Sequence, residues 1–163
     1  MSKDEKDVET LGKELRAKTM KVLGRSMAIR EVDAGSCNAC EVEVNSLTSS
    51  IYDIERFGLH IVASPRHADA LLVTGPVTRN MEVPLLKTYE AAPSPRIVIA
   101  MGACAISGGI FKDCYACNEG VSEFLPVDVL IPGCPPRPQA IIQGIMVALE
   151  KLESRKRGAS CQK

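Results

Sequence analysis

Short runs of apolar residues alternate with longer amphipathic stretches along the chain. Five of these runs are rich in β-branched residues and are bounded by glycine, proline, serine or aspartate, which predicts buried strands. Apolar residues at helical spacings predict helices between or after them. This alternation is typical of α/β proteins with a doubly wound parallel sheet in a three-layer sandwich. The expected strands are Met27–Val32, Leu59–Ala63, Ala70–Thr74, Arg96–Met101 and Val127–Ile131, and the expected helices are Glu41–Ser50, Met81–Ala92 and Arg137–Leu152.

The two ends of the chain lack this alternation. Residues 1–26 are highly charged, but a few apolar residues recur at helical spacings and predict an amphipathic helical arm. Two interpretations of the arm stay open, a solvated, partly frayed helix and a helix that docks on another subunit. Residues 153–163 are basic and without periodicity, so we expect a flexible tail with Cys161 as an incidental thiol. Residues 27–152 then form the single folded domain. The apolar positions of the arm are Val8, Leu11, Leu15 and Val22.

The composition narrows the classes of function. Lysine plus arginine and aspartate plus glutamate both number 20, so the formal charge of zero predicts no nucleic-acid partner. Aromatic residues make up only 4% of the chain and tryptophan is absent, which leaves few platforms for stacking bases. The first 25 residues carry charges of both signs and no apolar segment typical of a signal peptide, so we expect a cytosolic chain. Seven cysteines in a reducing compartment favour metal binding or redox chemistry over structural disulfides.

Four of the cysteines follow predicted strands in glycine-led segments. The segment "GSCNAC" comes after the first strand, "MGAC" after the fourth and "PGCPP" after the fifth. Open α/β sheets bind ligands outside the carboxyl ends of their strands, so these segments are expected to meet at one edge. The sequence therefore predicts a site of four thiolates, the set that a 4Fe-4S cluster requires. Its ligands would be Cys37, Cys40, Cys104 and Cys134.

The residues beside these cysteines favour a cluster over zinc. Gly35, Gly102 and Gly133 permit positive φ, which lets backbone amides point toward sulfur atoms. A proline follows Cys134, as in a bacterial cluster-binding run that ends in Cys-Pro. Structural zinc sites usually bring two Cys-x-x-Cys pairs within about 15–20 residues, much closer than the cysteines here.

Two other uses of the cysteines compete with this set. Cys114 and Cys117 form a second Cys-x-x-Cys pair, but 73 residues separate it from the Cys37–Cys40 pair, and a zinc site made of both pairs gives Cys104 and Cys134 no role. For Cys114 and Cys117 themselves a thiol pair, a disulfide switch, a lesser metal site and a pair of ordinary loop cysteines stay open. A dithiol oxidoreductase built on Cys37–Cys40 fits the position after a strand, but the nearby glutamates oppose a thiolate.

The same segments resemble those of a known family. "GSCNACEVEV", "SPRHADALLVTGPVT", "MGACAISGGIF" and "PVDVLIPGCPPRPQAIIQGI" are similar, in order and spacing, to segments of the small, cluster-carrying subunit of group 4 membrane-bound nickel-iron hydrogenases. The homologous subunit of respiratory complex I has the same segments. The resemblance covers residues 27–152 and implies a flavodoxin-like domain that holds one 4Fe-4S cluster through the four cysteines named above.

The spacing of the first two cysteines separates the branches of this family. The complex I subunit has them adjacent, whereas the hydrogenases place two residues between them. Asn38 and Ala39 stand between Cys37 and Cys40, so the resemblance favours the hydrogenase branch. Relatives often have glycine at the position of Ala39, and the family pattern gives Cys114 and Cys117 no role.

The resemblance also implies partners and a place in the cell. An electron-transfer subunit of this kind passes electrons between a ferredoxin-like 4Fe-4S subunit and the nickel-iron site of a large hydrogenase subunit. Membrane-arm subunits of the same complex would hold it peripherally on the cytoplasmic side of the membrane and couple the reaction to ion translocation. The chain is expected to be an electron carrier without a catalytic site of its own. The alternatives are a complex I-like quinone or sulfur oxidoreductase subunit and, in a different class, a structural zinc-binding interaction module.

Two polar residues match family positions. Arg66 in "SPRHAD" corresponds to a position near the cluster, where its charge would favour the reduced state. Glu43 corresponds to an acidic position after the second cysteine and is a candidate proton relay. For Glu43, as for Glu41, the competing interpretation is a favourable carboxylate in the first turn of a helix.

Overall fold

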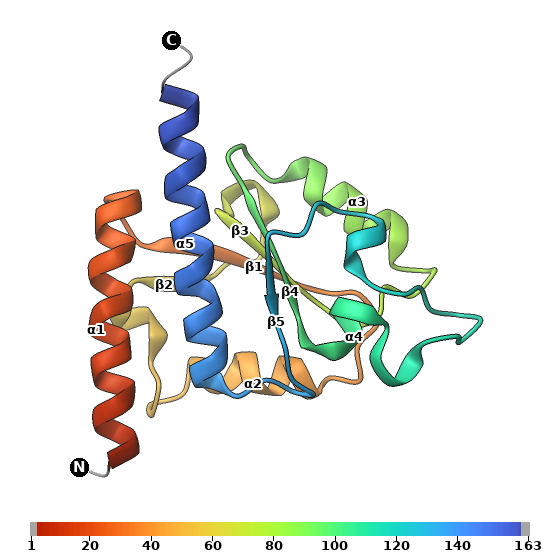
Figure 1. Ribbon diagram of the computed structural model, residues 1–163, viewed down its shortest axis with the longest axis horizontal. Coiled ribbons are helices and arrows are strands. Elements are labelled where there is room, and N and C mark those ends of the chain that lie inside the picture. The colour runs from red at the N-terminus through yellow and green to blue at the C-terminus, as the bar shows by residue number, and fades with distance from the viewer. Residues whose placement is uncertain (1–2, 161–163) are drawn as a thin grey trace.

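The computed structural model describes residues 3–160, with side chains for residues 8–155. Five parallel strands form one sheet in the order β2-β1-β3-β4-β5 (Figure 1). This strand order is that of flavodoxin-like folds, so the predicted fold class is confirmed. The strands are β1 (Met27–Asp33), β2 (Leu59–Ile61), β3 (Ala70–Thr74), β4 (Ile97–Met101) and β5 (Val129–Ile131).

Helices cover both faces of the sheet and form the two outer layers of the sandwich (Figure 1). One face packs against α1, α2 and α5, and the other packs against α3 and α4. None of the helices in the described part of the chain has both the length and the hydrophobicity needed to cross a membrane. The helices are α1 (Lys3–Leu23), α2 (Ala39–Leu47), α3 (Glu82–Ala91), α4 (Gly102–Ser107) and α5 (Pro138–Ser160).

The central strands are continuously apolar because the sheet is covered on both sides. All five residues of β3 and all five of β4 are buried. Strands of parallel sheets have this character, since side chains on both faces meet helices. The edge strand β5 differs, with Leu130 exposed between two buried neighbours.

Helix α1 packs on the domain itself. Leu15 is fully buried in the same apolar cluster as Leu149 of α5. A Cβ atom at Gly12 would lie 2.3 Å from the ring of Phe57, so the helix backbone lies directly against this ring. The predicted helix is therefore present, but its buried apolar side belongs to the core of this chain. The interpretation as a separate, solvated arm needs correction.

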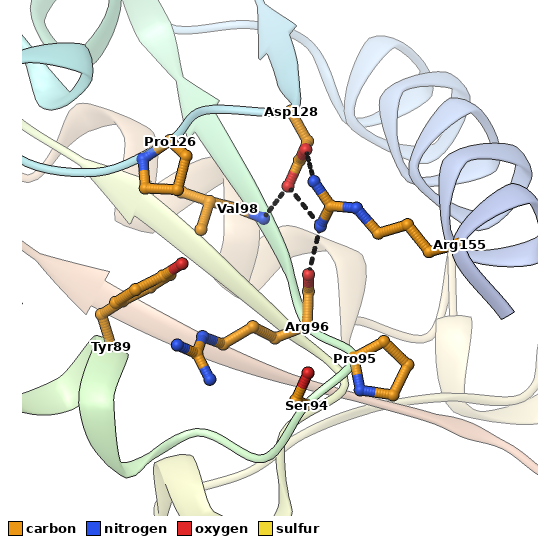
Figure 2. Close-up of a pocket in the computed structure, with 8 residues that line it drawn as sticks. All are labelled: Tyr89, Ser94, Pro95, Arg96, Val98, Pro126, Asp128 and Arg155. Atoms are coloured by element: carbon orange, nitrogen blue, oxygen red, sulfur yellow. Dashed lines mark hydrogen bonds and ion pairs between the residues drawn. The ribbon is translucent and has the colours of Figure 1, made fainter. Parts of the chain in front are cut away.

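Helix α5 continues to Ser160, whereas the sequence predicted a flexible tail from residue 153. Figure 2 shows Arg155 of α5 reaching the carboxylate of Asp128, which lies just before β5. Arg155 also donates a hydrogen bond to the carbonyl of Arg96, and Lys151 donates one to the carbonyl of Asp128. These bonds tie the last turns of α5 to the amino-terminal edge of the sheet. Cys161 lies outside the described residues.

Candidate metal centre

Three loops bring the four predicted ligands to the carboxyl edge of the sheet. Cys37 lies in the loop after β1, and Cys40 lies in the first turn of α2. Cys104 lies in α4, which begins directly after β4, and Cys134 lies in the loop between β5 and α5. The strand order is reversed between β1 and β3, and ligands of open α/β sheets bind at such a switch point.

The four thiols lie close enough to influence one another's ionisation. Burial raises the pKa of Cys40 to about 12, and the negative charges of Glu41, Cys104, Cys37 and Cys134 add to the rise. Burial also raises the pKa of Cys104, with contributions from the charges of Cys134 and Cys37. The four thiolates would repel one another, and a positively charged metal group bound between them would offset this repulsion and displace the protons of the thiols.

Backbone groups connect and support the ligand loops. The amide of Ala103 donates to the carbonyl of Gly133 at 2.8 Å, which joins the loop of Cys104 to the loop of Cys134. Backbone N–H groups of Ile110 and of Cys104 itself favour the thiolate of Cys104 and lower its pKa against the effect of burial. Such amide–sulfur hydrogen bonds stabilise negative charge on ligand sulfurs.

Gly102 leaves the space that the sulfur of Cys40 occupies. Its φ is +88°, and a Cβ atom there would lie 2.7 Å from Cys40 Sγ. A side chain at this position would therefore have to displace the sulfur of Cys40. Gly35 (φ +95°) and Gly133 (φ +147°) also have positive φ, as the sequence led us to expect.

A hydrogen-bonded network supports the first ligand loop. The Asp33 carboxylate accepts from the amides of Gly35 and Ser36 at 2.8 and 2.7 Å. The Ser36 hydroxyl accepts from the amide of Asn38 at 2.9 Å and donates to the carboxylate of Glu41 at 2.6 Å. The loop between β1 and α2 is thus held by side chains at both of its ends.

Glu41 is buried in the supporting network beside the cysteines. Its side chain is only 8% exposed, and its carboxylate also accepts a hydrogen bond from the hydroxyl of Thr74 at the end of β3. The sequence predicted a favourable carboxylate in the first turn of a helix, and Glu41 does lie in the first turn of α2, but its burial and its bond to Thr74 were not predicted. Thr74 lies 33 residues away in the sequence, so no local signal connects the two residues.

A second acidic residue lies near this network. Burial raises the pKa of Glu31 on β1, and the negative charges of Glu41 and Asp33 raise it further. The charge of Arg30 and a hydrogen bond with Thr74 lower it only in part. The ligand loop therefore lies over a locally acidic part of the sheet.

The two polar candidates, Arg66 and Glu43, lie in different places relative to the four cysteines. Arg66 is exposed in a short 3-10 helix, Pro65–His67, that precedes β3, whereas the cysteine loops follow their strands. Glu43 is half-buried on α2, three residues after Cys40. The two histidines of the sequence, His60 and His67, are also exposed.

The second Cys-x-x-Cys pair lies beside Cys104. Burial raises the pKa of Cys117, as do a hydrogen bond with the thiol of Cys114 and the charges of Cys114 and Cys104. Within residues 3–160 no group of three or more histidine, cysteine, aspartate or glutamate side chains is arranged around a position for one metal ion. In a 4Fe-4S cluster each cysteine binds a different iron, so its four ligands surround a larger volume than one ion fills.

The hollow drawn in Figure 2 lies at the opposite edge of the sheet. It has a volume of about 240 Å³ and includes Tyr89, Arg96 and Asp128. The guanidinium of Arg96 stacks on the ring of Tyr89 at 4.0 Å and donates to the carbonyl of Ala92. Asp128 binds Arg155 and the amide of Val98, so these charged groups serve to hold β4, β5 and α5 together.

Comparison with known proteins shows which family has this fold with cysteines at the carboxyl edge of its sheet. The family model described as "NADH ubiquinone oxidoreductase, 20 Kd subunit" matches residues 37–148, which include all four predicted ligands. The chain belongs to this family, and the resemblance seen in the sequence is confirmed.

The relatives come from several kinds of oxidoreductase. Formate hydrogenlyase subunit 7 of Escherichia coli is 48% identical over 86% of this chain and 55% of its own length, so the chain spans about half of that relative. A probable membrane-bound hydrogenase subunit, mbhJ of Pyrococcus furiosus, is 48% identical over 83% of this chain and 81% of its own length. A subunit of the NADH-quinone oxidoreductase of Geotalea daltonii is 49% identical over 69% of this chain and 66% of its own length.

A solved structure gives the same architecture. A chain in the structure of the membrane-bound sulfane sulfur reductase, described as an archaeal respiratory membrane complex, aligns with a TM-score of 0.71 at 37% identity. The alignment covers 86% of this chain and 77% of the other. The likeness therefore extends over most of the fold described above.

Proposed function

We propose that this chain holds one 4Fe-4S cluster through Cys37, Cys40, Cys104 and Cys134. The observation that carries the proposal is the convergence of these four cysteines, from three segments that each follow a strand, at one edge of the sheet. The surroundings fit the cluster, because Gly102 leaves room beside Cys40 Sγ and backbone amides support the sulfur of Cys104. A cluster bound there supplies one-electron transfer.

We further propose that the chain is the electron-transfer subunit of a membrane-bound nickel-iron hydrogenase. Electrons would pass between a ferredoxin-like 4Fe-4S subunit and the nickel-iron site of the large subunit, for proton reduction or hydrogen oxidation. Membrane-arm subunits would hold the chain peripherally on the cytoplasmic side of the membrane and couple the reaction to ion translocation. The two hydrogenase-related relatives and the Cys-x-x-Cys spacing support this assignment.

Glu43 is proposed to relay protons between the large subunit and solvent, since it lies one helical turn from Cys40 and is only half-buried. Arg66 is proposed to favour the reduced cluster through its positive charge. No hydrogen bond or ion pair among the described residues joins Arg66 to the cysteines, so this role depends on the family match alone.

A complex I-like quinone or sulfur oxidoreductase is the second candidate. The sulfane sulfur reductase structure and the NADH-quinone oxidoreductase relatives favour it, because the same electron path can end at a different acceptor. Nickel in the large subunit would distinguish the hydrogenase from this second candidate. A structural zinc module is the candidate from a different class.

Metal analysis of the complex purified without oxygen tests these proposals. We expect four iron and four acid-labile sulfide per copy of this chain beyond those of its partners, nickel in the large subunit, and hydrogen production from a low-potential one-electron donor. Cys104→Ser should lower the iron and sulfide content, whereas Cys114→Ser, a matched change in a neighbouring loop, should not. Zinc without sulfide on this chain would refute the cluster, and sulfur or quinone reduction without nickel would refute the hydrogenase.

A further inference from the structure

Cys114 and Cys117 lie at the two ends of one β-turn. The amide of Cys117 donates to the carbonyl of Cys114 at 3.0 Å, the hydrogen bond that closes a turn of four residues. The ends of such a turn lie less than about 7 Å apart between Cα atoms, and disulfides usually join Cα atoms about 4.4–6.8 Å apart. The backbone of the turn therefore brings the two cysteines within the range of a disulfide.

The body of the domain holds this turn in place. Cys117 forms an antiparallel bridge with Thr78, and the amide of Arg79 donates to the carbonyl of Ala116 at 3.0 Å. Asn118 continues the pairing through two hydrogen bonds to the carbonyl of Val77, at 3.2 Å from its amide and 2.7 Å from its side chain. The spacing of the two cysteines is thus set by the fold.

The pair is open to small molecules. Both cysteines are half-buried, and Tyr115 between them is 86% exposed. A surface hollow of about 490 Å³ borders the turn and is lined by Tyr115, Ala116 and the cationic Arg79, among others. A small anionic disulfide therefore has space and a positive charge beside the turn that carries the two cysteines.

We propose that Cys114 and Cys117 are a redox-active dithiol that exchanges with low-molecular-weight disulfides. The thiolate of Cys114 attacks one sulfur of the small disulfide, which forms a mixed disulfide and releases one small thiolate. The thiol of Cys117 then loses its proton and attacks Cys114 Sγ, which forms the Cys114–Cys117 disulfide and releases the second small thiolate. The protein dithiol is oxidised by two electrons and the small disulfide is reduced by two, so no other reactant is needed.

Cys114 is assigned as the attacking thiol because of its place in the turn. Cys117 belongs to the bridge with Thr78 and is fixed to the body of the domain, whereas Cys114 lies at the other end of the turn. Cys117, at the bridged end of the turn, is the residue that resolves the mixed disulfide.

Anaerobic exchange with oxidised glutathione tests the proposal on the full-length chain with its iron and sulfide in place. After alkylation of free thiols, cleavage after Lys112 and Glu119 releases residues 113–119, a peptide in which these are the only cysteines. We expect most of this peptide to carry an internal disulfide, dithiothreitol to restore the dithiol fully, and the iron content to stay unchanged.

Two single variants test the order of attack. In Cys117→Ser the mixed disulfide with glutathione should accumulate on Cys114, and in Cys114→Ser the thiol of Cys117 should stay free. A wild-type peptide that remains a dithiol at every glutathione ratio, or a bond from Cys117 to Cys104, would overturn the proposal. The wild-type measurement needs no substitution and does not depend on whether the chain serves a hydrogenase, so the two proposals fail separately.

Discussion

At the scale of single residues, Gly102 should decide whether Cys40 can act as a ligand. We predict that Gly102→Ala loses most of its bound iron, because the new Cβ atom would lie 2.7 Å from Cys40 Sγ. The positive φ adds a backbone cost of about 1–2 kcal/mol. Iron and sulfide per chain, together with the thermal unfolding midpoint, measure the two effects.

Gly24 provides the matched control for this change. It also has positive φ, +67°, but a Cβ atom there would meet nothing within 4 Å. Gly24→Ala should therefore lower the unfolding midpoint by a few degrees, about 2–4 °C per kcal/mol for a chain of this size, and keep its iron. Equal iron loss in both variants would mean that backbone strain alone explains the effect of Gly102→Ala.

Glu41 and Glu43 lie two residues apart on α2, and we predict that substitution of the first lowers stability whereas substitution of the second lowers activity. Glu41→Gln removes the charge from a buried carboxylate that binds Ser36 and Thr74, so its unfolding midpoint should fall by roughly 5 °C. Glu43→Gln should unfold near the wild-type midpoint and keep its cluster, but lose hydrogen activity if Glu43 relays protons. Wild-type activity in Glu43→Gln would remove that role, and an unchanged midpoint in Glu41→Gln would show that its hydrogen bonds contribute little.

The sequence predicted the four cysteines of this edge but missed the carboxylate beside them. Cysteines and glycines directly after apolar runs point to strand ends, and parallel strand ends share one edge. Glu41 has no such signal, since its burial depends on Ser36 and on Thr74 from another strand. Contacts between residues distant in sequence determine this part of the site, so a local pattern could not predict it.

At the scale of elements, the prediction succeeded where an apolar run was continuous and failed where a helix was shorter than two turns or ended in charges. Strand β3 was predicted with its exact bounds because all five of its residues are apolar or β-branched. Helix α4 was missed because its six residues are too few to show a period. The end of α5 was missed because charged residues there gave no apolar repeat, whereas an ion pair and two hydrogen bonds to carbonyls hold it against the sheet edge.

The ion pair between Arg155 and Asp128 should therefore stabilise the end of α5. Asp128 is only 10% exposed and is bound through both of its oxygens, so Arg155→Ala should cost about 1–2 kcal/mol and speed amide hydrogen exchange in the last turns of the helix. Lys21→Ala removes a 3.7 Å pair whose lysine is 69% exposed, and it should change little. Unchanged exchange in Arg155→Ala would show that helix packing alone holds these turns.

At the scale of the whole molecule, the apolar pattern predicted the layers of the sandwich but not the surface against which α1 packs. Val8, Leu11 and Leu15 formed a correct helical stripe, yet the stripe alone did not show which surface it covers. That surface is made by α5 and by the segment around Phe57, which come together only in the folded chain. A covered face of this kind can belong to the domain itself or to another subunit, and only the tertiary structure distinguishes the two.

The proposed cluster would join loops that lie 97 residues apart, from Cys37 to Cys134, so its removal should weaken the whole carboxyl edge. A group that binds only the folded chain stabilises it by about 4 kcal/mol when present at a thousand times its dissociation constant, which corresponds to roughly 10 °C here. We therefore predict that removal of iron by an anaerobic chelator lowers the unfolding midpoint by about this amount. Amide exchange should rise in residues 34–40, 102–111 and 132–137, whereas β3 and the ion-paired end of α5 should keep their protection.

The same treatment of Cys104→Ser, which already lacks one of the four proposed ligands, should change its midpoint little. If wild type and Cys104→Ser respond equally, the chelator acts elsewhere, and the four cysteines do not hold the group that stabilises this edge.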